Sequence, residues 1–174
     1  MLNIIRLTPS HAHVYRDLML LAYASEPEAF TSTVPEREPL PMAWWKERVS
    51  DAPEPRQCVF GAFVEDRLVG VAGLKFNMRV RTRHRATLFG MFVLPEFTGR
   101  GIGRDLVGAV LAAARRRPPV VVVDLTVTES NRPALRLYES CGFLRFGVEP
   151  LANRLGERFI AKVHMWCRID SQHD

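Results

Sequence analysis

Apolar residues recur along the first part of this chain at spacings that change from one segment to the next. Residues 3–7 predict a short first strand, and Thr8-Pro9-Ser10 then supplies the chemistry of a helix start. Prolines between residues 26 and 42 exclude one long helix, so we expect a loop there that leads into a short helix over residues 43–49. Between these segments, apolar residues near helical spacing predict a first helix: Val14, Leu18, Leu21 and Ala22.

From residue 58 on, the pattern is that of strands with helices between them. Residues 58–64 and 68–76 predict a hairpin, and residues 87–93 predict a further strand. A helix is predicted over residues 101–117, before Pro118-Pro119. Residues 120–127, VVVVDLTV, are apolar on both faces, as in an interior strand. A helix over residues 132–141, closed by Gly142, and strands over residues 143–148 and 159–169 complete the series.

This order of elements predicts an α/β fold in a single domain over residues 1–174. Strand, turn, helix and strand between residues 87 and 127 form a crossover, which joins parallel strands. The neighbouring hairpins join antiparallel strands, so the sheet is expected to be mixed.

Composition and charge narrow the range of partners. The net charge of +5 comes almost entirely from arginine and favours nucleic acid, a membrane surface or a phosphorylated cofactor. No apolar run is long enough to span a bilayer, and the start of the chain does not resemble a signal peptide. We therefore expect a soluble, cytoplasmic protein without a membrane partner. Cys58, Cys141 and Cys167 stand far apart without a CxxC pair, so neither a metal site nor a disulfide framework is indicated.

Three glycines alternate in the stretch Thr98-Gly99-Arg100-Gly101-Ile102-Gly103, between a strand and a helix. A dinucleotide fingerprint would need a small residue where Arg104 or Leu106 stands, and a Walker loop would need a Gly-Lys pair that the chain lacks. Two interpretations remain. One is a plain tight turn, and the other is a pyrophosphate held by backbone N–H groups at the helix start, with Arg100 and Arg104 adding charged contacts.

Two motifs together resemble the GNAT (GCN5-related) N-acetyltransferases. That family's acetyl-CoA signature, Gln/Arg-x-x-Gly-x-Gly/Ala, stands here at residues 98–103, with Thr98 where the family usually has glutamine or arginine. The threonine side chain is shorter than that of glutamine or arginine, and unlike arginine it carries no charge. The second element, N-x-x-A-x-x-L-Y-x-x-x-G-F, is matched in full by Asn131, Ala134, Leu137, Tyr138, Gly142 and Phe143.

The resemblance implies a mixed, strongly twisted sheet of about seven strands flanked by about four helices. It also implies an N-acetyltransferase that moves an acetyl group from acetyl-CoA directly to a primary amine, without a metal. Tyr138 would be the general acid that protonates the departing thiolate. Gly90 fits a bulge before a splayed strand, where the N–H of Phe92 or Val93 would steady the carbonyl oxygen. The cofactor-binding residues would be Met91, Phe92, Val93, Gly99, Arg100, Gly101, Ile102, Gly103, Arg104 and Asn131.

Several roles stay open at this stage. Candidates for the general base are Asp124, Glu129, His84, Glu26, Glu28 or a water molecule. The basic segment over residues 79–85 contacts the cofactor, the acceptor or only solvent. Trp44, Trp45 and Phe30 either wall the acceptor site or belong to the core.

The acceptor and the class of protein also remain open. The acceptor is a protein N-terminus, a lysine, a polyamine, an amino acid or an antibiotic. The oligomeric state is also open, and a homodimer is one possibility because dimers are common in the family. Two rival interpretations are a non-enzymatic acyl-CoA-binding or regulatory module and a basic nucleic-acid-binding protein.

Overall fold

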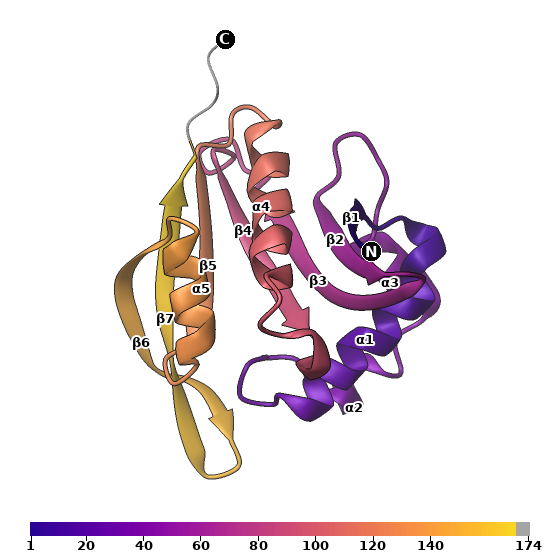
Figure 1. The fold of residues 1–174 in the computed structure, drawn as a ribbon. Helices are drawn as coiled ribbons and strands as arrows, with labels where there is room; N and C mark the ends of the chain where they lie inside the picture. The colour runs from indigo at the N-terminus through magenta and orange to yellow at the C-terminus, as the bar shows by residue number, and fades with distance from the viewer. Residues whose placement is uncertain (170–174) are drawn as a thin grey trace.

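The computed structural model describes residues 1–169 and is built around a seven-stranded twisted sheet (Figure 1). Its strand order is β1-β2-β3-β4-β5-β7-β6. Every neighbouring pair is antiparallel except β4 and β5, which are parallel. The predicted mixed sheet is therefore confirmed. The strands are β1 (Leu2–Arg6), β2 (Gln57–Val64), β3 (Arg67–Phe76), β4 (Arg85–Val93), β5 (Val122–Thr128), β6 (Leu144–Leu155) and β7 (Arg158–Arg168).

Helices cover both faces of this sheet. Figure 1 shows α4 and α5 in front of it, and a Cβ added at Gly70 of β3 would lie 3.2 Å from the Leu106 side chain of α4. On the other face, Arg48 of α3 lies over the Phe89 ring of β4. The α-helices are α1 (Ala12–Ser25), α2 (Val34–Arg37), α3 (Met42–Arg48), α4 (Ile102–Arg115) and α5 (Arg132–Ser140).

The buried stripe of α1 differs from the one expected. Leu18 and Ala22 are buried, but Val14 and Leu21 are 46% and 48% exposed. Two overlapping stripes of this helix fit the helical period, and packing against α3 selects the one that carries Tyr15. The Tyr15 ring meets the fully buried ring of Trp45 edge-on at 6.0 Å. Trp45 therefore belongs to the core.

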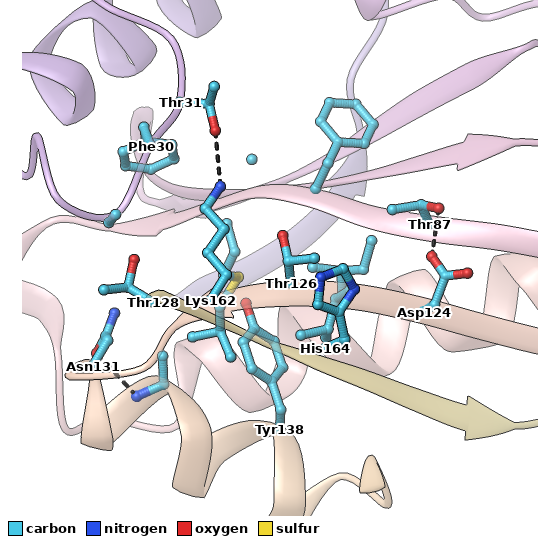
Figure 2. A pocket seen from close by; sticks show the side chains of 18 of the residues that line it. Phe30, Thr31, Thr87, Asp124, Thr126, Thr128, Asn131, Tyr138, Lys162 and His164 are labelled. Carbon is cyan, nitrogen blue, oxygen red and sulfur yellow. Dashed lines mark hydrogen bonds between the residues drawn. The ribbon is translucent and has the colours of Figure 1, made fainter. Parts of the chain in front are cut away.

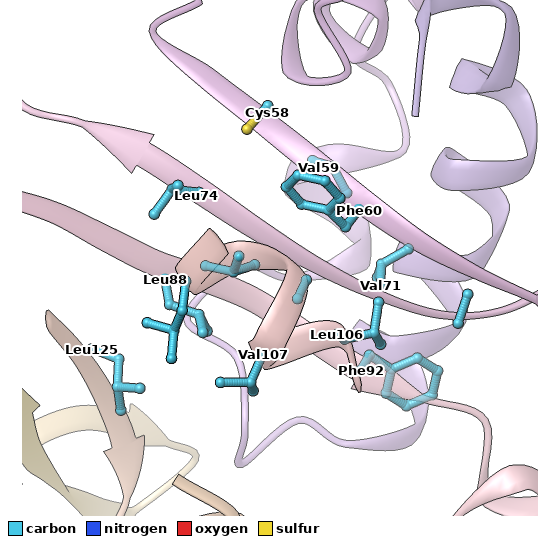
Figure 3. Close-up of a cluster of buried hydrophobic side chains, with 14 of the residues drawn as sticks. Cys58, Val59, Phe60, Val71, Leu74, Leu88, Phe92, Leu106, Val107 and Leu125 are labelled. Carbon is cyan, nitrogen blue, oxygen red and sulfur yellow. The ribbon is translucent and has the colours of Figure 1, made fainter. Parts of the chain in front are cut away.

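Side chains of α4 pack against both β4 and β5 and so link the two parts of the sheet. Figure 3 shows Val107 of α4 on the side of Leu88 in β4 and Leu125 in β5, and Leu106 of the same helix beside Val71 and Phe92. Each is at least 95% buried. Because full burial of such a side chain contributes about 1.5–3 kcal/mol, this cluster holds β4 and β5 under one helix even where their backbones separate.

The last hairpin is longer than its sequence pattern predicts. β6 was expected to end at residue 148 but continues to Leu155, paired with β7 across a turn at Gly156. Pro150 is tolerated because β6 is an edge strand, and the pairing register shifts between Glu149 and Asn153. The predicted domain over residues 1–174 reaches into residues 170–174, which lie outside the described residues. Among residues 1–169, no helix is long and apolar enough to cross a membrane.

Candidate active site

The parallel strands β4 and β5 pair only at their first residues and then diverge. Their register covers Arg85, Ala86 and Thr87 of β4 against residues 122–124 of β5. Asp124 holds this junction, because its carboxylate accepts hydrogen bonds from Arg85 Nη2 and Thr87 Oγ1, both at 2.6 Å. Beyond it, a cavity of about 490 Å³ lies between the strands, lined by residues 88–91 of β4 and 125–128 of β5. The predicted splay of β4 is thus present.

A bulge in β4 aims its backbone at this cavity. Phe92 pairs with Val71 and Phe89 pairs with Gly73, so Gly90 and Met91 together oppose one residue of β3. Gly90 takes a φ of +62°, which favours glycine. Gly90 and Met91 line the cavity, whereas Phe92 and Val93 are not among its lining residues. The Phe92 side chain is 3% exposed, so only its backbone could meet a cofactor.

The glycine loop leads into the N-terminus of α4. Gly99 and Gly101 have φ of +76° and +80°, and a Cβ on either would meet no other atom within 4 Å. Gly103 has helical backbone, and a Cβ there would lie 3.0 Å from Leu137 and 3.1 Å from Met91, both of which line the cavity. The glycines therefore serve two purposes: positive φ at the first two, and close packing against the cavity wall at the third.

Backbone donors are available at this helix start. The first N–H with a helical partner is that of Asp105, bonded to Gly101 O at 3.1 Å. Within residues 1–169, the N–H groups of Ile102, Gly103 and Arg104 have no backbone acceptor, as at any helix N-terminus. The Thr98 hydroxyl is engaged locally, since it donates to Pro95 O at 2.8 Å. An anion would be met here by N–H groups and the helix dipole.

Helix α5 brings Asn131 and Tyr138 to the opposite wall. The Asn131 side chain caps the helix by accepting a hydrogen bond from the Ala134 N–H at 3.3 Å. Tyr138 is 5% exposed and packs edge-on against Phe143, with 5.8 Å between ring centroids. Its hydroxyl makes no hydrogen bond within residues 1–169 and points into the cavity (Figure 2). Burial raises the pKa of the Tyr138 phenol above its ordinary value, so the group keeps its proton at neutral pH.

Three further side chains were missed from the sequence. Lys162 and His164 of β7 line the cavity, and Figure 2 shows both beside Tyr138. The His164 Nε2 lies 2.8 Å from the Glu149 carboxylate of β6. Arg48 lines the cavity from the α3 side. A lysine and a histidine two residues apart in an otherwise apolar strand share one face, and that signal could have identified them.

Residues 19–143 match the model of the Acetyltransferase (GNAT) family. The chain belongs to the GNAT acetyltransferase family.

The names of the curated relatives of this GNAT protein state different acceptors. The chain is 29% identical to the L-amino acid N-acetyltransferase AaaT of Escherichia coli over 119 residues. This aligned region covers 68% of this chain and 71% of that protein. Among three curated relatives that match at 29% to 35% identity, the chain spans 24%, 71% and 49% of their lengths.

Solved structures share the fold of this GNAT chain. A GNAT acetyltransferase from Streptococcus pneumoniae superposes with a TM-score of 0.86 at 22% identity, over 98% of this chain and 100% of that one. A Salmonella typhimurium protein solved with its cofactor acetyl-CoA has a TM-score of 0.80 at 18% identity, over 100% and 97% of the two chains.

The side chains named as base candidates occupy different places in this GNAT fold. Asp124 is held by Arg85 and Thr87, and Glu28 pairs with Arg158 at 2.6 Å. Glu26 lines the cavity from its rim, and partial burial raises the pKa of its carboxyl group. His84 and Glu129 are exposed and do not line the cavity. Residues 79–84 form a largely exposed turn.

The Asp124 contacts predict a stability effect. Asp124→Asn keeps the side-chain shape but removes the charge that Arg85 faces, so we expect the free energy of unfolding to fall by about 1–2 kcal/mol. The Arg85 side chain is 44% exposed, which keeps the expected loss near the lower end of this range. Urea unfolding measures it, with Asp66→Asn in the exposed β2–β3 turn as the matched control. If Asp124→Asn kept the wild-type stability but lost catalytic activity, Asp124 would instead be assigned to proton transfer.

Proposed function

We propose that this protein transfers the acetyl group of acetyl-CoA directly to the primary amine of an acceptor. The observation that carries the proposal is the cavity between β4 and β5. It is the place where the β4 bulge, the wall beneath the glycine loop and the protonated hydroxyl of Tyr138 converge. Family membership and a structural relative solved with acetyl-CoA support the choice of co-substrate.

The residues at the glycine loop fit a pyrophosphate. Backbone N–H groups at the start of α4 lack intrahelical partners, and both loop glycines leave open space where a side chain would stand. Arg104 is exposed beside them, while Arg100 donates to Glu96 O at 3.1 Å and lies over the Phe97 ring. Gly101, Gly103 and Arg104 would hold the phosphates, and Asn131 the pantetheine arm. Acetyl-CoA supplies an activated thioester when bound.

In this proposal Tyr138 gives a proton to the departing thiolate. As the amine nitrogen bonds to the carbonyl carbon, the carbon–sulfur bond breaks and sulfur gains negative charge. A phenol carries its proton at neutral pH, and one directed into the cavity can neutralise that charge. Backbone N–H groups at the β4 bulge would stabilise the carbonyl oxygen in the same step.

The proton that the amine loses also needs an acceptor. Among the cavity-lining residues, His164 has its ring Nε2 beside the Glu149 carboxylate at 2.8 Å. When that carboxylate accepts a hydrogen bond from the Nε2–H, Nδ1 carries the lone pair and can take a proton directly or through water. We assign the base function to His164 on this arrangement.

Calorimetry and thiol release test the proposed activity. Acetyl-CoA is expected to bind at micromolar concentration, and an amine in a diverse panel is expected to stimulate release of the free coenzyme thiol. Binding without any amine-stimulated release would favour the non-enzymatic acyl-CoA module. Absence of acetyl-CoA binding would contradict both and leave the nucleic-acid interpretation.

A further inference from the structure

The charges on the cavity wall do not balance. The carboxylate of Asp124 is already paired with Arg85. Two other charged side chains that line the cavity, those of Arg48 and Lys162, form no ion pair within residues 1–169. The remaining carboxylate among the lining residues is that of Glu26, at the rim. Two cations thus face one carboxylate. Both cations are half-buried, and partial removal from water without a counter-charge is unfavourable, so an anionic group on a ligand would offset that cost.

Lys162 reaches across the cavity toward the N-terminal part of the chain. Its Nζ donates to Thr31 Oγ1 at 2.8 Å, and Figure 2 shows it beside Phe30, above Tyr138. Thr31 supplies one neutral acceptor, which leaves two of the three ammonium protons without a protein acceptor in residues 1–169. The Glu149 carboxylate stands opposite Lys162 across β6 and β7 but bonds to His164.

The electrostatics of Lys162 agree with this geometry. Burial lowers the pKa of its ammonium group below the ordinary value, and the nearby Glu149 charge only opposes that shift. A ligand carboxylate within hydrogen-bond distance would favour the charged form of the lysine.

Arg48 adds positive charge at another part of the wall. Its guanidinium lies between two rings, 4.8 Å from the centroid of Trp44 and 4.9 Å from that of Phe89. Its Nε is buried and has no hydrogen-bond partner within residues 1–169. The aromatic rings hold the plane of the guanidinium in place but give it no counter-charge.

We propose that the acceptor is a small amine that also carries a carboxylate, as an amino acid does, and that Lys162 receives this carboxylate. The inference rests on the proposed acetyl transfer and names the substrate class for the same cavity. Arg48 strengthens the positive field. Among the cavity-lining residues that the structure describes, Glu26 is the one carboxylate without an ion pair, and it is available to the ammonium group before that group is deprotonated. A polyamine would meet an excess of positive charge here, and a peptide N-terminus would present a neutral amide in place of the carboxylate.

Matched acceptors test the substrate class. Thiol release is measured with a set of L-amino acids, the corresponding amides and the corresponding amines without a carboxyl group, with spermidine as a polycation. For the best amino acid, kcat/KM is expected to exceed that of its amide by about 10- to 100-fold, the value of one charge-assisted hydrogen bond. Preference for the amide, the simple amine or spermidine would overturn the inference while supporting acetyl transfer. No release with any amine would contradict the proposed function itself.

Substitution of Lys162 tests the assigned contact. Lys162→Met keeps the length of the side chain and removes its charge, so the ratio of acid to amide kcat/KM is expected to collapse toward one, chiefly through a higher KM for the acid. Lys162→Arg should restore part of that ratio. Lys46→Met, which removes an exposed lysine of α3, is the matched control and should keep the wild-type ratio. If Lys162→Met instead weakens acetyl-CoA binding in calorimetry and leaves the ratio intact, Lys162 serves the co-substrate and the inference fails.

Discussion

Replacement of Tyr138 by phenylalanine is expected to lower the single-turnover rate of acetyl transfer by about 10²–10⁴-fold. The substitution removes only the phenolic hydroxyl, because the ring keeps its contact with Phe143. Acetyl-CoA affinity and the free energy of unfolding should therefore change little. Rapid-quench measurement at saturating acetyl-CoA detects the effect even where product release limits steady-state turnover.

A second tyrosine provides the control for this prediction. Tyr15 is buried on α1 against Trp45 and does not line the cavity, so Tyr15→Phe removes a phenolic hydroxyl outside the site. Its single-turnover rate should match that of the wild type. If Tyr138→Phe also retained the wild-type rate, with chemistry shown to be rate-limiting, Tyr138 would be a packing residue and water would supply the proton.

Gly101→Val is expected to abolish acetyl-CoA binding at micromolar concentration, a loss of at least about 10²-fold in affinity. A β-branched residue at a φ of +80° is strained by about 1–2 kcal/mol, so the loop would relax away from its geometry. No protein atom lies within 4 Å of the added Cβ, which means that the side chain would occupy the open space assigned to the phosphates. Isothermal calorimetry with acetyl-CoA measures the change.

Gly108 separates this effect from a general loss of helix stability. It lies on the exposed side of α4, and a Cβ there also meets no atom within 4 Å, but its φ is not positive. Gly108→Val should therefore leave acetyl-CoA affinity at the wild-type value. Normal binding by a folded Gly101→Val protein would show that the loop is a tight turn without a phosphate-binding role.

The glycine loop and the α5 motif were predictable because their constraints are local. Positive φ at Gly99 and Gly101, a helix starting beside them and a helix closed by Gly142 at φ +96° all follow from short-range backbone chemistry. Gly103 shows the limit of that reasoning. The sequence grouped it with its neighbours, yet its small size is needed for contact with Leu137 and Met91, which come from two other elements.

Local pattern could have marked Lys162 and His164, but it could not show which side chains of other segments meet them in the cavity. Lys162, Thr31 and Arg48 are far apart in the chain and converge only because β7 lies beside β5 and the α1–α2 connection covers the cavity. Asp124 is a comparable case. The sequence left it as one of several base candidates, but pairing of β4 with β5 places Arg85 and Thr87 against it.

The sequence by itself determined the order of the elements apart from the short helix α2, which lies where a loop was expected. It also determined the single parallel crossover, the bulge glycine and the two motifs that indicate the family. Each depends on backbone preference or on residues a few positions apart. The tertiary structure decided which stripe of α1 is buried, how far β6 extends beside β7, and which charges on the cavity wall stay unpaired. Those outcomes depend on contacts between distant segments, where packing and charge pairing outweigh local preference.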